Sequence, residues 1–68
     1  MYTVEISIDL SNFPNYIHFT LLKVGNDERL FKYSSYNLGT IITYCVSNEI
    51  DVKELSFEIK LVKNGRDK

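Results

Sequence analysis

The stretch Leu38-Gly-Thr-Ile-Ile-Thr-Tyr-Cys-Val46 decides the fold, because its apolar residues follow a different spacing from the rest of the chain. They recur at i, i+3, i+4, i+7 and i+8, as Leu38, Ile41, Ile42, Cys45 and Val46. This spacing places one stripe of a helix against a core. The sequence therefore predicts a helix here.

The ends of this helix also carry sequence signals. Asn37 is the best N-cap candidate, since its side chain can accept from an amide of the first turn, and Ser35 is the alternative. The helix is expected to end at Ser47 or Asn48. Several β-branched residues and Gly39 weaken the helix propensity, so a strand is the competing interpretation of the same stretch.

The flanking segments alternate between apolar and polar residues, which predicts strands with one inward face. Strands are expected over about 2–9, 16–24, 29–34 and 53–63, and a loop over 11–15. The residues expected to face inward include Ile17, Phe31, Phe57, Ile59 and Leu61. The predicted fold is α+β and two-layered, with the order β-β-β-α-β and one helix on one face of a mostly antiparallel four-stranded sheet. Residues 1–68 are expected to form one small domain in which residues 65–68 fray. A right-handed crossover would place the last strand parallel to a strand of the first hairpin, and its exact neighbour stays open.

The hairpin of the second and third strands has two plausible registers. An odd loop of Gly25, Asn26 and Asp27 pairs Val24 with Glu28. Leu21 then opposes Phe31, Phe19 opposes Tyr33, and Leu22 opposes Leu30 on the outer face. An even loop pairs Val24 with Arg29 and puts Lys32 opposite Leu21. The odd register is preferred because it buries the apolar residues together.

Composition excludes several classes of protein. The chain has 68 residues, eight basic and nine acidic, and a net charge of −1, which argues against nucleic acid as the partner. No apolar run approaches a membrane span, and the N-terminus has no basic-then-apolar signal, so a cytoplasmic location is expected. The chain lacks alanine and is rich in Ile, Asn, Lys, Tyr and Phe, which indicates an AT-rich genome, such as that of a low-GC bacterium or its phage or plasmid.

No catalytic, metal or cofactor motif stands out. His18 is expected on the outer face of the sheet near Ser34, while Cys45 is expected inside, so the two cannot act together. Glu5 and Asp9 share one face of the first strand, as Glu54 and Glu58 share one face of the last. If these strands are neighbours, the acids form a patch, for which an acidic docking surface is favoured over acid–base catalysis.

Apolar residues outside the predicted core indicate a partner surface. Leu22 and Leu30 face outward together, and a homodimer would also support so small a core. The predicted partner-binding residues are Tyr16, Leu22, Leu30, Tyr36, Tyr44, Glu5, Glu54 and Glu58.

The layout from Tyr16 to Val62 resembles the small phage-encoded inhibitors of uracil-DNA glycosylase. The resembling parts are the Leu21-Leu22 pair, the polar turn at Gly25-Asn26-Asp27 and the strand ending in Tyr33, followed by one helix and one alternating strand. The resemblance implies a dimeric inhibitor that occludes the DNA-binding surface of its target.

These features together predict a small non-enzymatic protein of phage or mobile-element type. It would bind and inhibit or modulate a bacterial enzyme or defence component through protein–protein contact, with Leu22, Leu30 and Tyr44 as apolar anchors. One alternative is a nucleic-acid-binding module that uses Lys23, Lys32, Lys60, Lys63 and exposed tyrosines. A further alternative is a structural subunit of a larger assembly.

Overall fold

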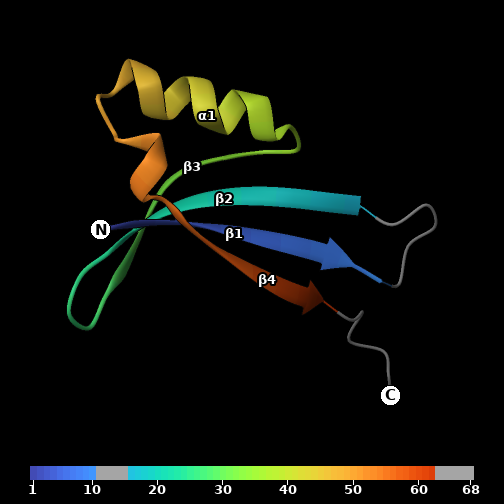
Figure 1. The fold of residues 1–68 in the computed structure, drawn as a ribbon. Coiled ribbons are helices and arrows are strands. Elements are labelled where there is room, and N and C mark those ends of the chain that lie inside the picture. Colours follow the sequence, from blue (N-terminus) through green and yellow to red (C-terminus); the bar gives the residue numbers. More distant parts are fainter. Residues whose placement is uncertain (11–15, 63–68) are drawn as a thin grey trace.

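A computed structural model describes residues 1–10 and 16–62 of the chain (Figure 1). The predicted order β-β-β-α-β is confirmed. The elements are β1 (Tyr2–Asp9), β2 (Tyr16–Val24), β3 (Arg29–Ser35), α1 (Leu38–Ser47), the short 3-10 helix η1 (Val52–Glu54) and β4 (Ser56–Val62). The predicted loop at 11–15 and the predicted tail at 65–68 lie outside the described residues. The last strand begins later than predicted, because η1 occupies its expected first residues.

The four strands form one sheet in the order β3-β2-β1-β4. β1 and β2 pair antiparallel, as do β2 and β3, whereas β4 pairs parallel to β1. The expected parallel pairing with a strand of the first hairpin is therefore present. The sheet is mixed rather than mostly antiparallel, because the connection through α1 returns the chain to the same end of the sheet.

The preferred register of the β2–β3 hairpin is wrong. The hairpin starts in the even register, with Val24 opposite Arg29, and then shifts between Leu21 and Leu22. Across this β-bulge the register skips Lys32, so that Leu21 meets Tyr33. The bulge thus removes the mismatch of Lys32 with Leu21, which had counted against the even loop.

Two further expectations about this hairpin change with the register. Leu30 opposes Lys23 and not Leu22, whose partner is Phe31. Phe31, expected inside, is therefore on the face away from Leu21 and is 63% exposed. An inserted residue in a strand moves every side chain beyond it to the other face.

Helix α1 is confirmed, and both of its ends are capped. The side chain of Asn37 accepts from the amide of Gly39 at 2.7 Å, as predicted for the N-cap. At the other end Glu49 has a φ of 60°, the left-handed conformation that reverses the chain. The amide of Ile50 donates to the carbonyl of Cys45 at 2.8 Å, and that of Glu49 donates to Val46 at 3.2 Å. This pair of bonds is a Schellman motif.

The core lies between α1 and the face of the sheet that α1 packs against. Four apolar residues in the described part of the chain are fully buried: Val4, Leu21, Ile41 and Cys45. Of the predicted helix stripe, only Ile41 and Cys45 are among them, whereas Leu38 is 37% and Val46 is 65% exposed. The buried stripe is therefore narrower than the spacing alone indicates.

One helix is too narrow to cover this sheet. A helix with its side chains is about 10–12 Å wide, and neighbouring strands lie about 4.8 Å apart, so α1 covers about two strands. It lies over β2 and β3, as Figure 1 shows. The apolar residues of β4 face the same side as the core but stay open, which corrects the expectation that Phe57, Ile59 and Leu61 lie inside. None of the helices in the described residues has the length and apolar character needed to span a membrane.

Candidate functional site

The uncovered part of the helix-side sheet face is the most distinctive surface of the protein. Its exposed members are Ile17 of β2 and Phe57, Ile59 and Leu61 of β4, which are 45%, 50%, 69% and 60% exposed. We call these four residues the open strip.

Strand register makes the open strip contiguous. Ile8 of β1 is paired with Ile17 on one side and with Leu61 on the other, and the three side chains share a face. Ile6 and Ile59 are paired in the same way, and Ile6 packs against the buried core. The open strip is therefore an extension of the core into solvent and not a set of scattered apolar residues.

The opposite face of the sheet is polar and carries an ion-pair cluster. Arg29, at the start of β3, donates from Nη2 to both carboxylate oxygens of Glu58, at 2.9 and 2.7 Å. Its Nη1 lies 4.0 Å from an oxygen of Glu5. The hydrogen bonds to Glu58 and the negative charges of Glu58 and Glu5 raise the pKa of Arg29. All three side chains remain partly exposed, so the cluster shapes a charged surface more than it stabilises the fold.

The predicted acidic patch forms only in part. Glu5 and Glu58 are direct neighbours in the β1–β4 pair, as expected if the two strands were adjacent. Arg29 shares its charge between them, so this patch does not present two free carboxylates. Glu54 is not on the sheet, because it belongs to η1.

The predicted apolar and aromatic candidates do not share one surface. Tyr16 and Tyr36 are 56% and 72% exposed, and Tyr36 lies against His18 with ring centroids 4.7 Å apart. The shifted register places Ser34 opposite Thr20, so the direct neighbour of His18 is Tyr36 and not Ser34. Tyr44 is stacked on Tyr33, with ring centroids 4.5 Å apart, and packs against the core.

The two leucines of the predicted surface are also separated. Leu22 is half-buried on the face that carries Arg29 and Phe31. Leu30 is 50% exposed and pairs with Lys23, whose side chain belongs to the other face. A single flat partner could not contact both leucines through the sheet face.

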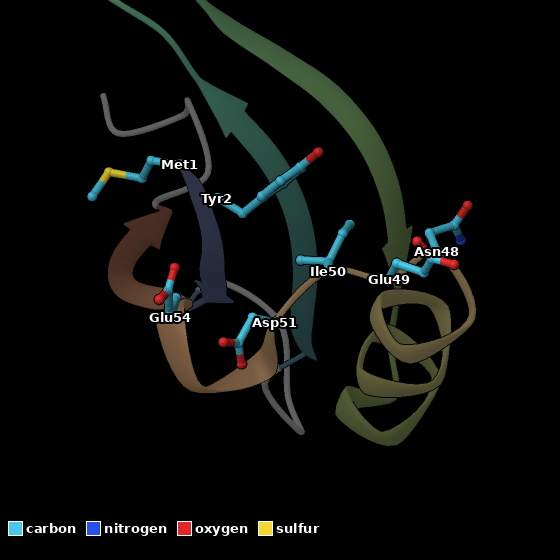
Figure 2. Close-up of a pocket in the computed structure, with 7 residues that line it drawn as sticks. All are labelled: Met1, Tyr2, Asn48, Glu49, Ile50, Asp51 and Glu54. Carbon is cyan, nitrogen blue, oxygen red and sulfur yellow. The ribbon is translucent and has the colours of Figure 1, made fainter.

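A hollow of about 440 Å³ lies where the start of β1 meets the connection from α1 to η1 (Figure 2). Its acidic members are Glu49, Asp51 and Glu54. Asp51 already accepts from the amide of Lys53 at 2.9 Å as the cap of η1, and Asn48 donates its side-chain amide to the carbonyl of Tyr44 at 2.8 Å. The hollow thus results from chain reversal after α1, and two of its polar side chains, Asn48 and Asp51, serve as local caps.

Residues 1–10 and 16–62 contain no cluster of metal-ligating side chains. No group of three or more His, Cys, Asp or Glu in this part of the chain could hold a metal ion. Cys45 is fully buried, and burial raises the pKa of its thiol, which disfavours the nucleophilic thiolate. His18 faces Ser7 on β1 and lies beside Tyr36.

Comparisons with protein-family models, with curated proteins and with solved structures found no match.

Sequence reasoning missed the open strip, although a signal for it was present. Alternation in β4 identified the correct face for Phe57, Ile59 and Leu61. The chain offers one helix for four strands, and the width of a helix leaves about half of such a sheet uncovered. The position of Arg29 had no comparable signal, because it depends on how the hairpin curls.

Proposed function

We propose that this protein is a non-enzymatic binding protein of phage or mobile-element type, which inhibits or modulates a bacterial enzyme or defence component through protein–protein contact. The observation that supports the proposal is the open strip, in which four large apolar side chains lie uncovered beside the core. A contiguous apolar patch on a small domain is typical of a partner surface. The composition, without alanine and rich in residues with AT-rich codons, supports the phage-type origin.

In this proposal the open strip replaces the anchors expected from sequence. Phe57 and Ile59 would enter an apolar groove of the target, as large apolar side chains do at the centres of interfaces. Leu22, Leu30 and Tyr44 are distributed over different parts of the molecule and would serve as secondary contacts at most.

The charged face would contribute orientation and not affinity. Glu5 and Glu58 share the guanidinium of Arg29, so this face combines both signs of charge. The proposed contact therefore differs from imitation of nucleic acid, which needs a row of free negative charges. The resemblance to inhibitors of uracil-DNA glycosylase stays a prediction about the class of protein.

Affinity capture with matched variants tests the proposal. Wild-type protein, Ile59→Asp and Phe31→Asp would each be used on lysates of low-GC bacteria. Ile59 and Phe31 are 69% and 63% exposed, but they lie on opposite faces of the sheet. We expect a specific protein that is retained by the wild type and by Phe31→Asp and lost with Ile59→Asp.

The captured protein must then change its activity when the purified wild type is added. Retention of the same protein by Ile59→Asp would contradict the role of the open strip. A target whose activity is unaffected by a saturating amount of the wild type would contradict inhibition or modulation.

A further inference from the structure

The two edges of the sheet are built differently. β3 carries a β-bulge at Lys32, which interrupts the regular spacing of backbone groups along that edge. β4 pairs with β1 through a continuous register over all seven of its residues, and it contains neither proline nor glycine. No strand in the described part of the chain pairs with its outer side. The edge of β4 therefore offers a regular row of backbone donors and acceptors to an added strand.

The sequence of β4 is complementary to itself when read in the opposite direction. With Ile59 at the centre, an antiparallel second copy would place Glu58 opposite Lys60 and Phe57 opposite Leu61. Directly opposed residues share a face, so the charges would meet on the polar side and the apolar residues on the open strip. Each of the two symmetry-related pairs would join a negative charge to a positive one.

Neighbouring registers lack this complementarity. Centring the pair on Glu58 opposes two carboxylates, and centring it on Lys60 opposes two ammonium groups. A register shifted by one residue opposes charged to apolar side chains, because it moves one strand's residues to the other face. Like charges directly opposite each other are destabilising, so the register centred on Ile59 is favoured over each of these.

We propose that two copies of this protein form a dimer by antiparallel pairing of their β4 strands, with Ile59 of each copy at the two-fold axis. The result is a continuous eight-stranded sheet in which both α1 helices lie on the same face, each over its own β2 and β3. Phe57, Ile59 and Leu61 of the two copies cover one another's flanks. Their remaining surface forms the floor of a trough between the helices.

Two features of the monomer support a second copy of the protein as the partner of β4. Only four apolar residues of the described chain are fully buried, and a domain of this size is marginally stable without help from a second chain. Glu58, which binds Arg29 at 2.7 Å, would gain Lys60 of the other copy as a further partner. The dimer does not depend on the proposed function, because it needs no host protein.

Sedimentation equilibrium on the purified full chain tests the dimer, with three charge variants beside the wild type. We expect a reversible monomer–dimer equilibrium for the wild type. Lys60→Glu and Glu58→Lys should each weaken it by about tenfold or more, because each makes both charge pairs repulsive. The double variant Glu58→Lys with Lys60→Glu should regain dimerisation, since the pairs are again of opposite sign. Circular dichroism verifies that each variant is folded.

A disulfide test locates the axis independently. In a Cys45→Ser background, Ile59→Cys should form a dimer under mild oxidation, since opposed residues have Cβ atoms about 5 Å apart. Ile17→Cys, on the same face but on β2, should stay largely monomeric under the same conditions. A wild type that stays monomeric at all concentrations overturns the proposal. So does a dimer that is insensitive to Lys60→Glu, or cross-linking of Ile17→Cys in place of Ile59→Cys.

Discussion

Arg29 and Glu58 join the two outermost strands of the sheet. Arg29 begins β3 and Glu58 lies in β4, with β2 and β1 between them in the strand order, yet their side chains are 2.7 Å apart. A flat sheet would separate these strands by about 14 Å. The sheet is therefore strongly curled, and the hairpin of β2 and β3 bends back over the polar face, as its path in Figure 1 indicates. The bulge at Lys32 increases the local twist and contributes to this curl.

The Arg29–Glu58 pair should depend on salt. We expect a double-mutant cycle with Arg29→Gln and Glu58→Gln to give a small favourable coupling that declines as salt is added, because both side chains are partly exposed. Urea unfolding at low and high salt, at one fixed low protein concentration, measures the coupling. Lys60→Gln paired with Arg29→Gln is the control and should show no comparable coupling. A coupling that is insensitive to salt would contradict an exposed ion pair.

Ile41 and Val46 should differ sharply as sites of truncation on the same helix. Ile41→Ala removes fully buried atoms and should lower the free energy of unfolding by about 2–5 kcal/mol, enough to unfold much of so small a domain. Val46→Ala should change it by less than about 0.5 kcal/mol, because Val46 is 65% exposed. Urea titration followed by circular dichroism compares the two variants. Similar losses for both would mean that α1 buries a different stripe.

Glu49 holds a backbone conformation that favours glycine. Glu49→Gly should therefore raise the free energy of unfolding by up to about 1 kcal/mol, since the left-handed conformation costs a side chain that amount. Lys53→Gly, in η1 and without a positive φ, should lower it instead. Thermal unfolding of the two variants measures the difference. Destabilisation by Glu49→Gly would indicate that its side chain contributes more than the strain removed.

Cys45 should make stability fall in mildly alkaline solution. Burial raises the pKa of its thiol above the ordinary value of 9.0, so the unfolded chain loses this proton first as the pH rises. The contribution of the protonated thiol to the free energy of unfolding is fully present below about pH 9. It is lost as the pH rises through the pKa of the folded state. We expect the stability of the wild type to fall more steeply above about pH 9 than that of Cys45→Ala. Parallel slopes for the two proteins would show that the thiol ionises equally in both states.

The local patterns of the sequence predicted most of the fold. Alternation identified β1 and β2 with their observed bounds, and Asn37 marked the start of α1. These signals are short-range, because side-chain direction and capping depend on neighbours in the chain. The parallel pairing of β4 followed from the chirality of connections.

The remaining features depend on contacts between distant segments. No local pattern predicts the bulge that skips Lys32, because the bulge depends on which residues of β2 and β3 oppose each other. Alternation gave the face of Ile59 but could not show whether anything covers it. The open strip was therefore assigned to the core, while the partner surface was predicted at Leu22 and Leu30, which lie on different faces of the sheet.

Extension of a β-sheet into a fibril requires each molecule to accept a neighbour at both of its edges. The interrupted ladder of β3 cannot match a regular incoming strand along its whole length, whereas a dimer formed through β4 would already have used the uniform edge of the described sheet. In such a dimer, the bulge at Lys32 would prevent further sheet extension. A protein with one apolar edge strand can then remain a dimer and not form fibrils, because its other edge does not accept a further strand.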